Sequence, residues 1–286
     1  MNGAPDLLVV DLDGTLLCPR GQVSESNRQA LQAAQTAGVD VMVATGRTHA
    51  ECGDILLSIE YEGPLVIASG AALVDWPSGR TLARAPLSMP DVTAVTEALQ
   101  SHQCAALLLK DQHEVGYDYF VVGESLLHPV SRWWFELHGI KLRSGESHQD
   151  DAHPEHTLRV ASIGEPDHME MAARTVDERL GDRVFWRHWP AVGRQGERVH
   201  MLEVFAAGVD KWTMVKHYCQ QRGFTSDRVA AIGDGLNDIQ LLTQTGFGIA
   251  MENAETSVRE AADAQTLCHS KDGVAHAVDR LLKGWS

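Results

Sequence analysis

Short apolar runs alternate with helical stretches in the first third of the chain. The runs Leu7–Val10, Val39–Ala44 and Leu65–Ala68 have the length and the near-continuous apolar composition of buried strands. Between the first two, Ser26–Ala37 is helix-like, and Gly38 stands where helices commonly stop. Buried strands separated by helices of this length predict βαβ units and a parallel sheet.

The last third of the chain repeats this alternation. We predict a helix at Lys211–Gln221, a strand at Val229–Ile232 and a helix that begins within Asp238–Thr243. A short strand at Gly248–Met251 follows. The amphipathic stretch Asp272–Leu282 predicts a final helix.

The middle of the chain has a different pattern, without glycine-terminated turns between strands and helices. Its predicted helices are Met89–Gln100 and Asp167–Leu180, and its predicted strands are Ala105–Leu109, Leu158–Ile163 and Val184–His188. This order is typical of an α+β domain.

We therefore predict two domains, which also fits a length of 286 residues. Residues 1–85 and 191–286 would form an α/β core with a parallel sheet, and residues 86–190 an inserted α+β domain. The turn-forming stretches Pro77–Gly79 and Gly193–Gly196 are candidate hinges between the two.

Composition narrows the possible partners. A formal net charge of −15 argues against a surface for nucleic acid or anionic membrane, but not against a small anionic substrate, because a metal ion can reverse the charge locally. The five cysteines are odd in number and show no CxxC spacing, which indicates a reducing compartment. We see neither a signal peptide nor an apolar run of membrane-spanning length, and expect a cytoplasmic protein.

Asp11 and Asp13 follow directly after the first predicted strand, at the sheet edge where α/β proteins place their ligands. A carboxylate can attack phosphorus and form an acyl-phosphate, and carboxylate oxygens suit Mg²⁺. Gly14 then allows a tight turn. An isolated pair of this kind more often binds only water, so its meaning depends on the other motifs.

Polar groups also lie at the end of the second predicted strand and at the start of a later predicted helix. Thr45 and Gly46 follow the second strand, where a hydroxyl and exposed backbone N–H groups suit a phosphate oxygen or merely cap a helix. Lys211 begins a predicted helix, where a cation works against the helix dipole. It is therefore a candidate for neutralising a phosphate, the alternative being a solvated surface lysine.

Asp234, Asn237 and Asp238 follow the strand Val229–Ile232. Asp234 could complete the oxygen shell of a metal, and Asn237 could donate to a substrate oxygen. Asp238 could tether Lys211 or water bound to the metal. It could equally serve as an acid favoured at a helix N-terminus.

The chain carries DLDGTL, VATGRT, GVDKWTMV, AIGDGLNDIQLL and GIAMENA in this order. With these segments it resembles the haloacid dehalogenase (HAD) superfamily of phosphohydrolases over nearly its whole length, and within it the Cof-type sugar-phosphatase group with a C2-type cap. The resemblance implies a Rossmann-like parallel-sheet core with helices on both faces and an inserted α+β cap domain.

The resemblance also implies roles for the catalytic and metal-binding residues. Asp11 would be the nucleophile and a ligand of Mg²⁺, and Asp234 a second ligand. Asp13 would act as general acid and then as general base, with its backbone carbonyl on the metal. Lys211 would neutralise the charge of the phosphate and the nucleophile, as phosphoryl transfer requires.

For the phosphate itself, the resemblance implies contacts from the Leu12 backbone, Thr45, the Gly46 N–H, Lys211 and Asn237. Two positions depart from the family pattern. Ser69 stands where the family often has Asn, and its shorter side chain reaches less far. Glu252 stands where the family usually has Gly, and we expect it to point to water.

The leading hypothesis is Mg²⁺-dependent hydrolysis of a small phosphomonoester, a sugar phosphate or a phosphorylated cofactor, through an aspartyl-phosphate. The alternatives are a phosphomutase on the same core and a non-catalytic, phospho-accepting signalling domain. The sequence leaves the substrate and the oligomeric state open.

Basic and aromatic residues gather near the end of the insert: Arg183, Arg187, His188, Trp189 and Arg194. They could contact a second phosphate or a sugar face. We favour a strand with one packed and one solvated face. The histidines His148, His153 and His156 lack the spacing of metal ligands, and we expect a polar loop there.

Overall fold

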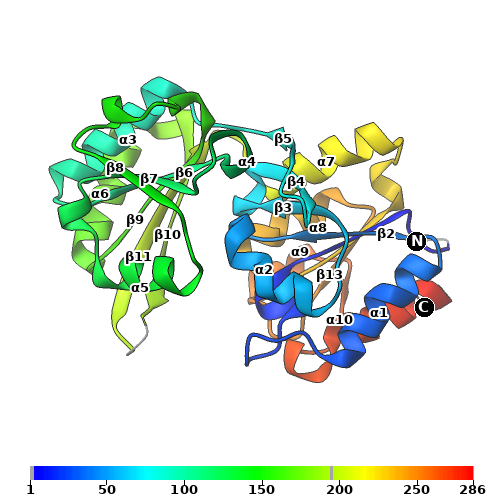
Figure 1. The fold of residues 1–286 in the computed structure, drawn as a ribbon. Helices are drawn as coiled ribbons and strands as arrows, with labels where there is room; N and C mark the ends of the chain where they lie inside the picture. Colours follow the sequence, from blue (N-terminus) through cyan, green and yellow to red (C-terminus); the bar gives the residue numbers. More distant parts are fainter. Residues whose placement is uncertain (1–2, 194–195, 286) are drawn as a thin grey trace. The chain divides into compact units, whose positions relative to one another are not determined.

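The computed structural model describes residues 3–193 and 196–285, and the chain divides into two compact units (Figure 1). The first unit comprises Met1–Ala83 and Asp210–Ser286, and the second comprises Arg84–Val209. The first unit is thus built from both ends of the chain, with the second inserted between them.

The first unit is organised around one sheet, which has eight strands in the described part of the chain, ordered β14-β13-β12-β1-β2-β3-β4-β5. The strands from β14 to β3 are parallel, as predicted, and β4 is antiparallel to β3. Their bounds are β1 (Leu7–Val10), β2 (Asp40–Ala44), β3 (Gly63–Ile67), β4 (Ala72–Trp76), β5 (Thr81–Arg84), β12 (Val229–Gly233), β13 (Phe247–Ala250) and β14 (Ala264–Gln265).

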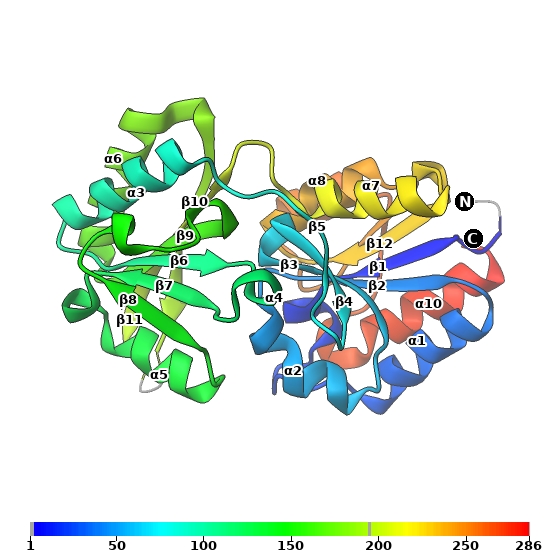
Figure 2. The same ribbon diagram turned by 45° about the horizontal axis from the view of Figure 1, so that its top comes forward.

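Helices cover both faces of this sheet, which explains why β1 is apolar at all four positions and fully buried. The helices are α1 (Glu25–Thr36), α2 (His49–Ser58), α7 (Lys211–Arg222), α8 (Ile239–Gln244), α9 (Thr256–Ala261) and α10 (Gly273–Lys283). In Figure 2, α7 and α8 lie on one face, and α1, α2 and α10 on the other. The predicted parallel-sheet core with helices on both faces is confirmed.

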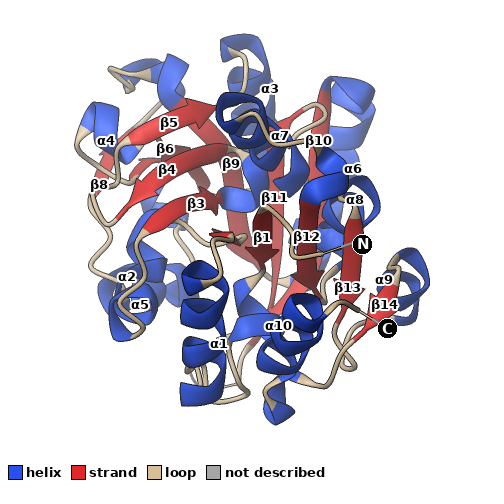
Figure 3. Cartoon of the chain, turned by 90° about the vertical axis from the view of Figure 1, so that its right-hand side faces the viewer, coloured by secondary structure: helices blue, strands red, loops and turns tan. Residues whose placement is uncertain are grey.

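Helices α1 and α10 join the two ends of the chain. They lie side by side in Figure 3, and the buried side chain of Asn27 accepts a hydrogen bond from the Ala275 N–H at 3.0 Å. Ser24 caps α1 by accepting the Asn27 N–H at 3.1 Å. The predicted helix at Ser26–Ala37 is therefore present, one residue earlier than expected.

The second unit is an α+β fold, as predicted. In its described residues, six strands follow the order β10-β11-β9-β6-β7-β8, with every neighbouring pair antiparallel except β7 and β8. The strands are β6 (Ala106–Lys110), β7 (Tyr119–Val122), β8 (Leu142–Gly145), β9 (Thr157–Gly164), β10 (Val184–Val192) and β11 (Arg198–Ala206). Helices α3 (Met89–Ser101) and α6 (Pro166–Leu180) cover one face, and α5 (Pro129–Leu137) lies on the other (Figure 2); α4 (Gln112–Val115) is a single turn.

The second unit extends to Val209, beyond Pro190, where we expected the insert to end. The reason is β11, which pairs with β10 on one side and β9 on the other. No helix lies between β10 and β11, so the sequence carries no local sign of where the insert ends. Strand pairing alone assigns β11 to the second unit.

Neither candidate hinge lies between the units. Pro77–Gly79 forms the turn between β4 and β5, where the Gly79 N–H donates to the Asp75 carbonyl at 2.8 Å. Gly193 and Gly196 belong to the turn between β10 and β11. Glycine and proline are common in hairpin turns as well as in linkers, because turns and linkers use the same backbone conformations.

All five cysteines are free. Across residues 3–193 and 196–285, no helix has both the length and the apolar character that a bilayer crossing requires.

Gly70 lies where the end of β3 meets the start of α7. Its φ is +104°, and a Cβ there would lie 1.8 Å from the Asp210 carbonyl oxygen and 2.8 Å from the Lys211 nitrogen. Any larger residue must therefore displace the backbone that carries Lys211.

We expect Gly70→Ala to lower the free energy of unfolding of the first unit by about 3 kcal/mol, from left-handed strain and overpacking together. Gly38→Ala is the matched control, because Gly38 has φ +85° and open space around its Cβ position; it should cost only about 1 kcal/mol. Urea unfolding of both variants measures the difference. Equal losses of unfolding free energy in the two variants would show that the close contact between position 70 and Asp210 adds nothing to the left-handed strain.

Candidate active site

Asp11 is the first residue after β1, at the edge where the parallel strands end. Its backbone N–H donates to the carbonyl of Ile232, in β12, at 3.0 Å. Its side chain is 7% exposed, so the carboxylate is buried. The neighbouring ends of β2 and β12 bring their loops to the same edge.

The turn after Asp11 is shaped by Gly14, whose φ is +78°. A Cβ on Gly14 would lie 2.1 Å from Oδ2 of Asp234, so only glycine allows this approach. The next residue, Thr15, donates from Oγ1 to Oδ1 of Asp234 at 2.8 Å. The DLDGTL segment thus packs directly against the carboxylate of Asp234 in the AIGDGLNDIQLL segment.

Lys211 is fully buried, and its ammonium group lies between two carboxylates. It donates to Oδ1 of Asp11 at 2.5 Å and to Oδ1 of Asp238 at 2.6 Å. The N-terminus of α7 is held by Asp210, whose carboxylate accepts the Thr213 N–H at 2.8 Å. The alternative of a solvated surface lysine is therefore wrong.

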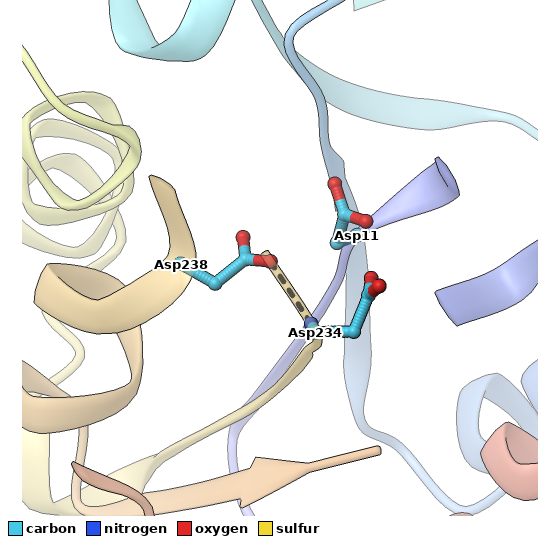
Figure 4. A group of neighbouring side chains, drawn as sticks. All are labelled: Asp11, Asp234 and Asp238. Atoms are coloured by element: carbon cyan, nitrogen blue, oxygen red, sulfur yellow. Dashed lines mark hydrogen bonds between the residues drawn. The ribbon is translucent and has the colours of Figure 1, made fainter. Parts of the chain in front are cut away.

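Asp238 holds both Lys211 and the loop that carries Asp234. Its Oδ2 accepts the Asp234 N–H at 3.0 Å, drawn as the dashed line in Figure 4, and the Gly235 N–H at 2.9 Å. Both of its oxygens are thus used by protein donors, in a fully buried position. Asp238 is therefore the tether of Lys211, and it is also the acid in the first turn of the short helix Leu236–Asp238, where it caps the Gly235 N–H.

The carboxylates of Asp11, Asp234 and Asp238 form the one group of three ligating side chains found in the described residues, with ligand atoms within 4.8 Å of one another. Burial raises the pKa of Asp11 well above its usual value against the opposing effect of Lys211. Burial likewise raises the pKa of Asp234, to about 6. Burial disfavours the charged Lys211, yet Asp11 and Asp238 raise its pKa and keep it protonated.

The site also carries more acidic than basic side chains. Three carboxylates face one ammonium, which leaves two negative charges. Asp11 and Asp234 supply hard oxygen donors, the ligand type that Mg²⁺ prefers. The residues present therefore fit a divalent cation of this kind.

Asp13 forms an ion pair that the sequence did not predict. Arg47 binds both of its oxygens, from Nε at 2.8 Å and from Nη2 at 2.7 Å. The Asp13 side chain is 56% exposed, unlike the buried Asp11. Arg47 directly follows the predicted Thr45-Gly46 pair, and that position was the only sequence signal for it.

The loop after β2 lies against the loop after β3. Thr45 is fully buried, and its Oγ1 accepts the Arg47 N–H at 3.2 Å. A Cβ on Gly46 would lie 3.2 Å from Oγ of Ser69 and 4.0 Å from Nδ2 of Asn237. Ser69, one of the two departures, thus lies beside two residues predicted to hold phosphate.

Ser69 reaches this place through an unusual backbone. Its φ is +56° and that of Ala68 is +47°, the left-handed region that non-glycine residues rarely adopt. The Ser69 N–H donates to the Thr45 carbonyl at 2.9 Å and the Ala68 N–H to the Arg47 carbonyl at 2.8 Å. Such strain is often found at functional sites.

Leu12, predicted to offer its backbone to phosphate, is fully buried within the turn after Asp11. Its carbonyl accepts the Leu17 N–H at 2.9 Å.

Glu252, the second departure, does more than point to water. Its side chain is 52% exposed, but Oε2 accepts the Cys268 N–H at 3.1 Å and the Lys271 ammonium at 3.2 Å. The carboxylate thus points to water, as expected, and it also pairs with Lys271.

The basic and aromatic residues of the insert have partners within their own unit. Arg187 and Trp189 both donate to Glu203, at 2.7 and 3.2 Å, and His188 contacts His200 at 2.8 Å. Strand alternation separates them, since Arg187 and Trp189 share one face of β10 and His188 lies on the other. Arg183 pairs with Asp91, and Arg194 lies outside the described residues.

The stretch that contains His148, His153 and His156 is an irregular segment of two short turns, as expected. The buried Lys110 anchors it, donating to Asp151 and, at 3.1 Å, to the His153 carbonyl.

Comparison with known proteins gives matches to hydrolases and phosphatases. The family described as haloacid dehalogenase-like hydrolase matches residues 8–278. A 5-amino-6-(5-phospho-D-ribitylamino)uracil phosphatase of Bacillus subtilis is 27% identical, over 95% of this chain and 94% of its own. A pyridoxal phosphate phosphatase of Escherichia coli is 25% identical, over 95% and 97%.

Among solved structures, a haloacid dehalogenase-like hydrolase from Bacteroides thetaiotaomicron superimposes with a TM-score of 0.76 and is 25% identical. The match covers 97% of this chain and 99% of that one.

We expect Asp238→Asn to lower the free energy of unfolding by about 3 kcal/mol, since an amide cannot accept from Lys211 and from two backbone N–H groups at once. Asp279→Asn is the matched control, because Asp279 pairs with Lys283 on the surface; it should change stability by less than about 0.5 kcal/mol. Urea unfolding compares the two. A wild-type midpoint for Asp238→Asn would contradict a structural role for this tether.

Proposed function

The chain belongs to the haloacid dehalogenase-like hydrolases and is a phosphoric monoester hydrolase, and we propose that it works with Mg²⁺ through an aspartyl-phosphate at Asp11. The observation that carries the proposal is the buried ammonium of Lys211, shared by Asp11 and Asp238 beside Asp234. Burying the ammonium group of a lysine beside a strand-end carboxylate costs desolvation free energy. Such a lysine is therefore expected where negative charge has to be neutralised.

In the first step, an oxygen of Asp11 forms a bond to phosphorus and the bond from phosphorus to the ester oxygen breaks. Asp13 gives its proton to the departing alcohol. Lys211 stays protonated and offsets the charge of the phosphoryl group and of Asp11. Splitting the displacement into two steps in this way is nucleophilic catalysis.

In the second step, water attacks the phosphorus of the aspartyl-phosphate. Asp13 takes the proton from this water, and the bond from phosphorus to Asp11 breaks to restore the carboxylate. Arg47 donates one hydrogen bond to each oxygen of Asp13 in the structure, and each oxygen can accept a further partner. Arg47 can therefore orient Asp13 in both steps.

Mg²⁺, when bound, would neutralise charge on the transferring phosphoryl group. Asp11, Asp234 and the backbone carbonyl of Asp13 would hold it. Thr45, the Gly46 N–H, the Leu12 backbone and Asn237 would hold the phosphate oxygens, and Ser69 lies beside them.

We propose a small phosphomonoester as the substrate, either a sugar phosphate or a phosphorylated cofactor. The two named relatives support this class, because one acts on a phosphorylated ribityl compound and the other on pyridoxal phosphate. The net charge of −15 disfavours nucleic acid as a partner. A panel of phosphorylated metabolites, assayed for phosphate release, identifies the substrate.

We expect phosphate release from a generic aryl phosphate to stop on treatment with EDTA and to return with added Mg²⁺. Asp11→Asn should lower kcat by at least ~10³-fold, because an amide is not a nucleophile here. Asp279→Asn, the same chemical change at a surface ion pair, should keep wild-type activity. Full activity in Asp11→Asn would exclude Asp11 as the nucleophile.

We expect Asp13→Ala to accumulate the aspartyl-phosphate with an aryl phosphate substrate. A good leaving group needs little help from an acid, whereas the second step still needs a base. Acid quenching and mass spectrometry should find the phosphoryl group on the peptide that contains Asp11, labile to hydroxylamine. The double variant Asp11→Asn, Asp13→Ala should carry none. Label on another residue, or none in Asp13→Ala, would contradict the mechanism.

A further inference from the structure

One segment that resembles the family, GIAMENA, has no role in the mechanism above. Asn253 lies in it, in the turn that follows β13, and it is exposed. Its side-chain amide nevertheless contacts three other parts of the first unit. Nδ2 donates to the Gly14 carbonyl at 2.8 Å and lies 3.3 Å from Oδ2 of Asp234, while Oδ1 accepts the His269 N–H at 2.9 Å.

These contacts fix the orientation of the amide. The His269 backbone N–H can only donate, so the atom facing it must be the amide oxygen. The NH₂ group of Asn253 must then face the Gly14 carbonyl and Asp234. A flipped amide would place an oxygen against two acceptors.

Asp234 is consequently held by a donor on each oxygen. Thr15 donates to Oδ1 at 2.8 Å, from the loop after β1, and Asn253 reaches Oδ2 from the loop after β13. Gly14 closes the space on the same side. Each carboxylate oxygen accepts more than one partner, so a cation can bind while both donors stay in place.

The turn that carries Asn253 is itself anchored. The Met251 N–H donates to the Gly233 carbonyl at 3.0 Å, and Glu252 binds the Cys268 N–H and Lys271. His269 in turn donates from Nδ1 to the Leu17 carbonyl at 2.9 Å, next to the loop after β1. Glu252 stands where the family usually has Gly, so this part of the anchor departs from the family pattern.

We propose that Asn253 is a positioning residue that holds Asp234 in the orientation in which it binds the divalent cation. The proposal rests on the proposed function, because it takes Asp234 as a metal ligand. Partners that orient metal ligands typically change metal affinity 10- to 100-fold when they are removed.

The test is Mg²⁺ binding to EDTA-treated protein without substrate, measured by calorimetry and by the Mg²⁺ concentration needed to raise the Tm. We expect Asn253→Ala to bind Mg²⁺ about 10- to 100-fold more weakly. Its Tm without metal should stay near wild type, because Asn253 is exposed and its truncation leaves no cavity. At saturating Mg²⁺, kcat and KM should return to wild-type values.

Ser270→Ala is the matched control. Ser270 is exposed in the neighbouring turn, and within the described residues its hydroxyl donates only to the Cys268 sulfur, so Mg²⁺ affinity should not change. Should Asn253→Ala fold poorly, Asn253→Ser keeps a small polar side chain that is too short for the contacts, and it should show the same loss.

Wild-type Mg²⁺ affinity in both Asn253 variants would overturn the proposal and leave the proposed function intact. A lower kcat at saturating Mg²⁺ with unchanged affinity would also overturn it, since Asn253 would then act on the reaction itself. Absence of Mg²⁺ binding and of Mg²⁺-dependent activity in the wild type would overturn the proposed function together with this inference.

Discussion

The ammonium group of Lys211, buried between Asp11 and Asp238, is the contact on which the rest of the first unit depends. It joins residues 200 positions apart in the chain, one directly after β1 and one at the start of α7. A buried charge is tolerated only when it is paired, so both carboxylates must be held in place. Asp238 achieves this by also accepting two backbone N–H groups of the loop after β12. The nucleophile, its neutralising cation and the third carboxylate are therefore one electrostatic unit.

Such a unit requires backbones to approach closely, and glycines make this possible. Gly14 lets the first loop lie against Asp234, and Gly70 lets the end of β3 lie against the start of α7. Thr15 and Asn253 then bind the two oxygens of Asp234 from opposite loops. The carboxylates lie in fixed positions, and burial raises the pKa of both Asp11 and Asp234. A negatively charged site whose carboxylates are held in place suits a divalent cation, which in turn can bind a phosphoryl group.

In the second unit, charged and aromatic side chains on β10 and β11 are paired with one another, with Arg187 and Trp189 both on Glu203. These contacts satisfy the charges locally and fix the side chains. A contact of these residues with a second phosphate or a sugar face stays a prediction, and so does the cytoplasmic location expected from the sequence.

The sequence alone determined the α/β core, the inserted α+β unit and the loops that carry the chemistry, because apolar periodicity and strand-end motifs are local signals. It placed Asp11, Thr45, Lys211 and Asp234 at strand or helix ends, but it left open whether Asp238 is a tether or a helix N-terminal acid. The tertiary structure shows that it is both, and only the tertiary structure paired Arg47 with Asp13, Asn253 with Asp234 and β11 with β9. These are contacts between distant segments, which depend on how the loops approach one another in space, and no local pattern in the chain records that distance.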